Sequence, residues 1–153
     1  MTERISYQDV APAFMNSLNN IEQQLKKSGL SLKLLELVKY RVSQVNSCAF
    51  CLDMHHKEAL ELGEEELRLH SLPAWRECPF YSDKERVVLA FAEAVTNAID
   101  GEVEDHVFNP LQRFFSKQEI AALTIAITQI NTWNRINKVF RTVPGKYQVG
   151  QFG

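Results

Sequence analysis

The sequence predicts an all-α protein that forms a single domain of about six to seven helices. Apolar residues recur every three to four positions through most of the chain, and this is the period of a helix with one buried face. No segment shows the two-residue alternation or the short turn pairs that are typical of strands and hairpins. Two Ser-x-x-Glu sequences, at Ser82–Glu85 and Ser116–Glu119, are capping boxes that start helices. The length of 153 residues, 45% of them hydrophobic, suits one core.

Residues 1–30 are expected to form an N-terminal helix of the same domain. Ser6 and Asp9 are typical of a helix start, and Gly29 is typical of a helix end. The apolar positions between them are Val10, Phe14, Leu18, Ile21 and Leu25. Ser31 is a candidate N-cap for a second helix over about residues 32–45. Its apolar stripe consists of Leu34, Leu35, Val38, Val42 and Val45.

The remaining helices follow from similar signals. A third helix is expected from Cys48 to about Leu62, with Asn46 or Ser47 as its cap and Gly63 as its end. The other expected segments are a short helix over 64–72, an irregular loop over 73–81, helices over 87–99 and 119–140, and a short helix within 103–115. The domain core is thus expected at 31–142, and residues 143–153 are expected to be a C-terminal arm or disordered.

The longest predicted helix has no charged residue between Ile120 and Asn134. A helix without a charged face is buried on several sides, either inside the domain or in an interface between subunits.

Composition excludes several classes of function. The formal net charge is −2 and the charges are interspersed, so nucleic acid and anionic membranes are not expected partners. No signal peptide is recognisable at Met1–Arg4, and the apolar run at 120–130 is too short to span a bilayer. The expected location is the cytoplasm. Structural disulfides are rare there, so a Cys-x-x-Cys pair indicates redox or metal chemistry.

The chemistry concentrates at residues 46–56, where Cys48, Cys51 and His55 are spaced to share one face of a helix. Spacing of three residues puts the two cysteine Cα atoms roughly 5–6 Å apart, which permits a disulfide. The helix N-terminus favours a thiolate at Cys48, and His55 can accept the proton of the Cys51 thiol one turn away. Thiolates are the species that attack peroxides and disulfides.

These cysteines admit two other interpretations. A structural zinc site needs four ligands, and only one Cys-x-x-Cys half is present. In the second alternative, the two cysteines are buried and act as small apolar side chains beside a core histidine. The remaining residues of this kind are interpreted as structural: Cys78 as a spectator, His70 and His106 as surface residues, and Trp75 and Trp133 as packing residues.

With these residues in view, the chain resembles the AhpD-like alkylhydroperoxidases of the carboxymuconolactone decarboxylase superfamily, from about Leu34 to Arg141. The motif Glu-x11-Cys-x-x-Cys-x-x-x-His of that family is met by Glu36, Cys48, Cys51 and His55. Supporting features are Asn46-Ser47, Gly63, the helix over 82–96 and the Asn131–Arg135 sequence of the last helix.

The resemblance implies an AhpD-like helical bundle, often assembled as trimers or hexamers, that acts as a peroxidase. No cofactor and no metal are expected. It implies that Cys51 meets a hydroperoxide, that Cys48 resolves the sulfenic acid as a disulfide, and that Glu36, through water, and His55 relay protons. An external dithiol, such as a lipoyl protein or a thioredoxin-like or peroxiredoxin partner, would reduce the disulfide.

Two residues complicate the resemblance. Characterised AhpD proteins carry a second histidine just before the second cysteine, where this chain has Phe50. Glu36 lies away from the apolar stripe of its helix, which by itself predicts a surface carboxylate. A non-catalytic redox sensor or assembly module is the main alternative function. A lactone decarboxylase is less favoured, because the decarboxylases of the superfamily do not depend on the cysteine pair.

Overall fold

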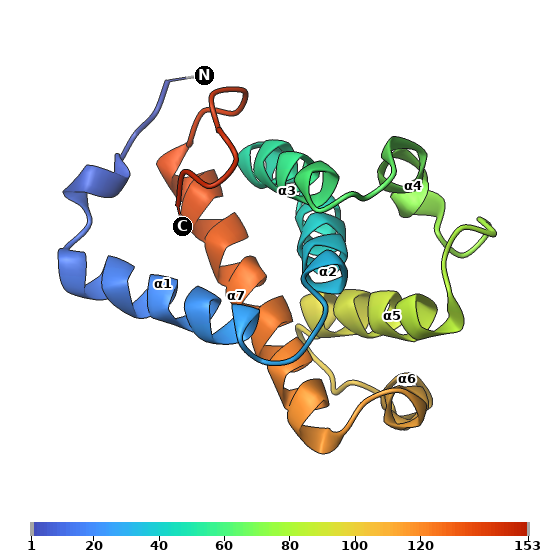
Figure 1. Ribbon diagram of the computed structural model, residues 1–153. Coiled ribbons are helices and arrows are strands. Elements are labelled where there is room, and N and C mark those ends of the chain that lie inside the picture. Colours follow the sequence, from blue (N-terminus) through green and yellow to red (C-terminus); the bar gives the residue numbers. More distant parts are fainter. Residues whose placement is uncertain (1, 153) are drawn as a thin grey trace.

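The computed structural model describes residues 2–152 and confirms an all-α, single-domain protein (Figure 1). These residues contain seven α-helices and three short 3-10 helices, and no strand. The α-helices are α1 (Pro12–Lys26), α2 (Leu32–Val45), α3 (Ala49–Glu61), α4 (Glu66–Ser71), α5 (Asp83–Asn97), α6 (Asp105–Phe108) and α7 (Lys117–Phe140). The 3-10 helices are Tyr7–Asp9, Leu72–Ala74 and Asn109–Arg113.

Helix α2 lies at the centre of the bundle and packs against α3, α5 and α7. Its predicted apolar stripe is confirmed, because Leu35, Val38 and Val42 are almost completely buried. On α7 they meet a buried row that includes Leu123 and Ile127. Each such side chain contributes about 1.5–3 kcal/mol through the apolar area that it removes from water. This core holds α2, against which α3 packs, and these two helices carry the motif.

The uncharged part of α7 is buried on its inner sides and open on its outer side. Figure 1 shows this helix crossing the whole molecule between α1 and α2. The outer row consists of Ala121, Ile125, Thr128 and Thr132, and Ile125 is 50% exposed. The expectation of burial inside the domain is therefore met on the inner sides only.

The N-terminal helix begins later than the sequence pattern predicted. Ser6 and Asp9 do form a capping box, but it opens the 3-10 turn Tyr7–Asp9 and not α1. Proline disfavours helical backbone in the residue before it, and Ala11 is extended (φ −55°, ψ 130°). Helix α1 consequently starts at Pro12, a position that proline favours. Phe14, which the sequence pattern placed on the apolar face of this helix, is 70% exposed.

Other helix boundaries follow their caps. The capping boxes at Ser82 and Ser116 start α5 and α7, so α5 begins one turn before the predicted residue 87. The predicted loop over 73–81 contains buried Trp75, whose indole N–H donates to Glu93 at 2.8 Å. Within residues 2–152, no helix combines the length and the apolar character needed to cross a bilayer.

The segment 143–152 is an ordered arm that folds back onto α3 (Figure 1). The backbone N–H of Gly145 donates to Asp53 at 2.8 Å, and that of Gly150 donates to Glu58 at 3.0 Å. Lys57 donates to the carbonyl of Tyr147 at 3.0 Å, and the Tyr147 ring is buried. The arm therefore covers the face of α3 that carries the motif.

Candidate functional site

The start of α3 is set by the end of α2. Helix α2 ends at Val45 with Asn46 as its C-cap, and Ser47 adopts a left-handed conformation (φ +52°) that turns the chain into α3. The N-cap of α3 is Cys48, so the prediction that Asn46 or Ser47 would cap this helix was wrong. The Asn46 amide is engaged elsewhere, because it donates to the side-chain oxygens of Asn131 and Asn134 on α7, at 2.9 and 2.8 Å.

Cys48 and Cys51 are joined by a disulfide, with their Cα atoms 5.4 Å apart as the sequence spacing predicted. Cys48 has extended backbone (φ −93°, ψ 99°), so it precedes the first turn in which the sequence pattern placed it. Cys51 lies within the helix, one turn before His55. Both cysteines and His55 are buried, with exposed fractions of 1%, 2% and 5%.

Glu36 on α2 is hydrogen-bonded to His55 on α3, with 2.7 Å between Oε2 and Nδ1. The simple amphipathic pattern of α2 had indicated a surface position for Glu36, but only 13% of its side chain is exposed. Its other oxygen, Oε1, lies 3.1 Å from the ammonium of Lys39, and that ammonium also lies 3.1 Å from Glu22 on α1. An ion pair from α1 thus reaches the side of α2 that an isolated helix would leave in water.

This row of charges fixes the protonation of the glutamate. Burial disfavours the charged carboxylate, but His55 and Lys39 outweigh it and lower the pKa of Glu36 to about 2. Burial likewise opposes the charge of Lys39, yet Glu36 and Glu22 raise its pKa above the ordinary lysine value. An ionised carboxylate only accepts hydrogen bonds, so Nδ1 of His55 carries the proton. When the ring carries only this proton, its free lone pair is on Nε2.

A cavity of about 420 Å³ adjoins these groups. Cys51, His55, Glu36 and Lys39 all line it, whereas Cys48 does not. Its other walls come from α1, α3, α7 and the arm at 143–152, and they include Met15, Met54, Trp133, Tyr147 and Phe152. The cavity therefore has an apolar, largely aromatic wall opposite a charged row, and one of the two sulfurs faces it.

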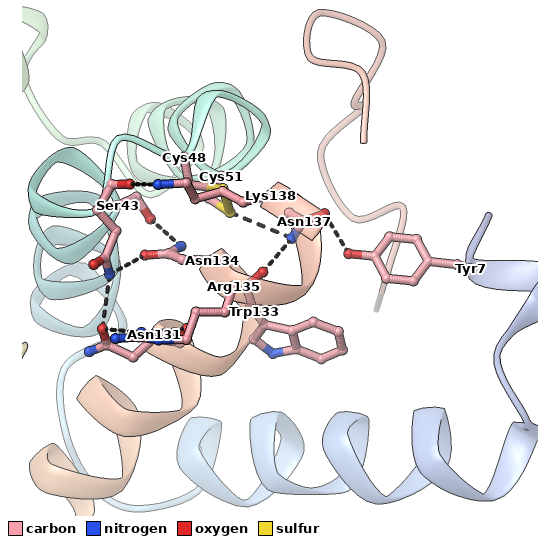
Figure 2. Close-up of a disulfide and its surroundings, with 11 residues drawn as sticks. Tyr7, Ser43, Cys48, Cys51, Asn131, Trp133, Asn134, Arg135, Asn137 and Lys138 are labelled. Carbon is pink, nitrogen blue, oxygen red and sulfur yellow. Dashed lines mark hydrogen bonds between the residues drawn. A yellow bond between two sulfur atoms is a disulfide. The ribbon is translucent and has the colours of Figure 1, made fainter. Parts of the chain in front are cut away.

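Asn137 of α7 contacts the cavity-facing sulfur (Figure 2). Its Nδ2 lies 3.5 Å from Cys51 Sγ and donates to the carbonyl of Trp133 at 2.9 Å. Its Oδ1 accepts from the hydroxyl of Tyr7 at 2.7 Å. Burial raises the pKa of Tyr7 to about 12, so this phenol is a neutral donor. Nearer α2, Asn134 donates to Ser43 at 3.1 Å and completes a row of amides beneath the disulfide.

Phe50 occupies the position where the resemblance expects a histidine. Its ring is 93% buried and packs edge-on against Tyr147 and Phe152 of the arm, each with 6.4 Å between ring centroids. The side chain thus supplies apolar wall to the cavity and anchors the arm, and it brings no proton-transfer group to this position.

The other singled-out residues lie apart from this site. Cys78 is free and half-buried, and its sulfur lies 3.8 Å from the carbonyl of Ser71. His70 and His106 are exposed, as predicted. His56 faces Glu66 at 3.3 Å, away from the cavity. In the part of the chain that the structure describes, no group of three His, Cys, Asp or Glu side chains is arranged to hold a metal ion.

The structure brings together all four residues of the predicted motif and adds Lys39, Glu22 and Asn137, which the sequence reasoning missed. A signal for Lys39 was present in its spacing of three residues from Glu36. A signal for Asn137 was the spacing of Asn131, Asn134 and Asn137, which places three amides along one side of a helix. This arrangement can form and break a disulfide, move a proton at one sulfur and enclose an apolar molecule beside it.

Comparison with known proteins gives concordant matches. The sequence profile of the carboxymuconolactone decarboxylase family matches residues 12–94. The uncharacterized protein YdfG of Bacillus subtilis (strain 168) is 39% identical over 137 residues, which are 90% of this chain and 93% of YdfG.

A crystal structure of a protein of unknown function from Agrobacterium tumefaciens, proposed to be the antioxidant defence protein AhpD, is 37% identical. It covers 95% of this chain and 100% of its own, with a TM-score of 0.90. An uncharacterized peroxidase-related protein from Silicibacter shares the fold, with a TM-score of 0.80, 24% identity and coverage of 95% and 77%.

Proposed function

This chain belongs to the carboxymuconolactone decarboxylase family and has the AhpD-like fold, and from that premise we propose that it is a thiol-dependent peroxidase. It reduces organic hydroperoxides to alcohols and is oxidised from a dithiol to a disulfide in each cycle. One observation carries the proposal: Cys51, in a disulfide with Cys48, faces a cavity shared with a buried Glu36–His55 pair.

In the first step, Cys51 is the attacking residue. Its position on the cavity wall supports this order over attack by Cys48, which lies behind it. His55 takes the thiol proton on Nε2, directly or through a water held by Glu36, and the thiolate attacks the outer oxygen of the hydroperoxide. The O–O bond breaks as the S–O bond forms, and the departing alkoxide takes the proton from His55. The products are an alcohol and a sulfenic acid on Cys51.

In the second step, Cys48 resolves the sulfenic acid. Its thiolate attacks Cys51 Sγ, an S–S bond forms, and the S–O bond breaks. The hydroxide that leaves combines with the proton of the Cys48 thiol to give water. The 5.4 Å separation of the two Cα atoms lets this happen without unfolding α3. Because Cys48 is the N-cap, the free N–H groups of the first turn of α3 favour its thiolate.

An external dithiol completes the cycle. Its thiolate attacks the cavity-facing sulfur of Cys51, Cys48 leaves as a thiolate, and a second exchange releases the oxidised reductant. A lipoyl protein and a thioredoxin-like or peroxiredoxin partner are the classes to be tested. We further propose that the protein acts in the cytoplasm as a trimer or hexamer, with the uncharged outer row of α7, which includes Ile125, as one contact surface.

The test is steady-state consumption of an organic hydroperoxide with dihydrolipoamide, thioredoxin and glutathione as alternative reductants. Cys51→Ser is expected to abolish turnover, and Cys78→Ser, the matched control, is expected to keep it because Cys78 lies away from the cavity. Robust peroxide consumption by the double variant Cys48→Ser/Cys51→Ser would refute the proposal. Absence of turnover with every reductant, together with an oligomeric state that follows oxidation, would favour a redox-sensing module instead.

A further inference from the structure

Asn137 is a buried amide whose polar atoms are all directed at specific partners. It lies in the last turns of α7, and only 5% of it is exposed. One side of the amide meets the carbonyl of Trp133 and the sulfur of Cys51, and the other meets the hydroxyl of Tyr7 (Figure 2). Tyr7 belongs to the 3-10 turn that precedes α1, so three distant parts of the chain meet at this side chain.

These partners determine which way the amide points. A backbone carbonyl can only accept a hydrogen bond, so the –NH₂ end of Asn137 must face Trp133. The oxygen end then faces Tyr7, whose neutral phenol donates to it. The second N–H of the same –NH₂ group is left to point at Cys51 Sγ, 3.5 Å away. The donor at the sulfur is therefore fixed by the network and not by an arbitrary choice between nitrogen and oxygen.

The sulfur in the structure belongs to a disulfide, and it stands for the Cys51 sulfur of the reduced protein. A disulfide sulfur is a weak acceptor, whereas a thiolate carries a full negative charge and accepts strongly. A buried donor that is held beside this atom therefore gains most of its interaction when the thiol loses its proton. His55 provides the destination of that proton, but an acceptor for the proton does not by itself stabilise the charge left on sulfur.

We propose that Asn137 is a catalytic residue whose side-chain N–H donates to Cys51 Sγ and stabilises the thiolate that attacks the substrate, with Tyr7 as the residue that positions the amide. This inference rests on the proposed function for the identity of the attacking sulfur. In this inference, one residue accepts the proton of the Cys51 thiol and another stabilises the thiolate. His55 receives the proton on Nε2, and Asn137 stabilises the negative charge that remains on Cys51 Sγ.

The experiment measures alkylation of Cys51 by iodoacetamide across pH in the fully reduced protein, with site-resolved mass spectrometry as the readout. Asn137→Ala is expected to raise the midpoint pH of this reaction by about one unit, the order of shift that one hydrogen bond to a charged sulfur produces. Asn137→Asp is expected to raise it further, since a carboxylate repels the thiolate. Tyr7→Phe is expected to raise the midpoint pH by less, because Asn137 keeps its N–H donor but loses the hydrogen bond from the Tyr7 hydroxyl that orients it.

Asn134→Ala is the matched control. Asn134 is a completely buried amide one turn earlier on α7, bonded to Ser43 and Asn46 and not to Cys51. Its loss should lower stability as much as the loss of Asn137, but it should leave the Cys51 midpoint unchanged. An equal shift in both alanine variants, or no shift in folded Asn137→Ala, overturns the assignment.

Tyr7→Phe and Asn137→Asp decide the question if Asn137→Ala does not fold, and no shift in either of them also overturns it. Because the assay contains no peroxide, its outcome is separate from that of the turnover test. A protein without peroxidase activity can still show the Asn137 shift, and an active peroxidase can fail to show it.

Discussion

The start of α3 differs from the starts of α5 and α7 in how one sequence spacing is used. In α5 and α7, serine at the N-cap and glutamate three residues later exchange hydrogen bonds with each other's backbone. In α3 the same two positions are Cys48 and Cys51, which are joined by a disulfide, and no side chain caps the helix. The redox pair thus stands where the other two helices carry a capping box.

At the start of α3, the stabilising capping box is replaced by a pair of cysteines. A capping box satisfies N–H groups of the first turn and stabilises the helix. A thiol or disulfide sulfur accepts hydrogen bonds only weakly, and the first turn of α3 receives no side-chain cap. The position of α3 is secured from outside instead, because the Cys48 N–H donates to Ser43 at 3.0 Å and Asn46 is held by the amides of α7. Residues of α2 and α7 therefore stabilise the start of α3, and its N-cap position is occupied by a cysteine.

The largest expected effect comes from making α3 resemble the other helices. Cys48→Ser places a good N-cap residue on α3 and removes the resolving thiol. Under the proposed function, steady-state turnover with a protein dithiol should fall by about a thousandfold or more. Oxidation of Cys51 to the sulfenic acid should persist and be trapped by dimedone. Cys51→Ser is the counterpart, and dimedone labelling at Cys48 in that variant would reverse the order of attack.

A smaller effect is expected from the glutamate that supports α3. The pKa of Glu36 is lowered from 4.5 to about 2 in the folded protein, so its contribution to stability is complete above pH 5 and is lost as the pH falls towards 2. A difference of that size corresponds to about 3 kcal/mol. Glu36→Gln should therefore be less stable than the parent at pH 7 by that order, with the gap closing near pH 2. Urea unfolding at a series of pH values measures it.

The control for this prediction is Glu119→Gln in the capping box of α7. Glu119 also has a lowered pKa, because the Ser116 backbone and hydroxyl donate to it, but it lies at the surface of the protein and only part of it is covered. Glutamine can still fill its place in a capping box, so this variant should keep the stability profile of the parent. An acid profile for Glu36→Gln that matches the parent would mean that the buried ion pair contributes nothing to stability.

The smallest effect is expected at the caps themselves. Ser116→Ala removes the hydroxyl that accepts from the Glu119 N–H and should lower the free energy of unfolding by about 1 kcal/mol. For a chain of this length the thermal midpoint would fall by roughly 2–4 °C, as measured by calorimetry. Peroxide turnover should stay at the parent level. A loss of turnover larger than the loss of stability would show that the start of α7 is coupled to the cavity.

The sequence predicts this fold well where a local signal determines the structure. The boxes at Ser82 and Ser116 and the glycine at 63 mark helix ends because their hydrogen bonds and backbone angles are local. The N-cap at Cys48 could not be found in this way, because cysteine is not a capping residue and the position depends on α7.

The site is harder to predict because its burial comes from distant segments. Glu36 lies off the apolar stripe of α2, and it is buried because α3 brings His55 against it and α1 brings Glu22 against its partner Lys39. The family spacing identified Glu36, whereas local periodicity did not. Lys39 was missed because its burial depends on Glu22 of α1, and Asn137 because its partner at sulfur is 86 positions away.

The row of Glu22, Lys39, Glu36 and His55 has a consequence for how the proposed peroxidase reaction responds to salt. With formal charges at neutral pH, this row and a protonated Cys51 together carry one net negative charge. Moving the Cys51 proton to His55 leaves that total unchanged and only redistributes charge between neighbouring side chains. The field felt outside the cavity therefore changes little during deprotonation, and mobile ions have little to screen. For an uncharged hydroperoxide, the rate of the first step should be nearly independent of ionic strength.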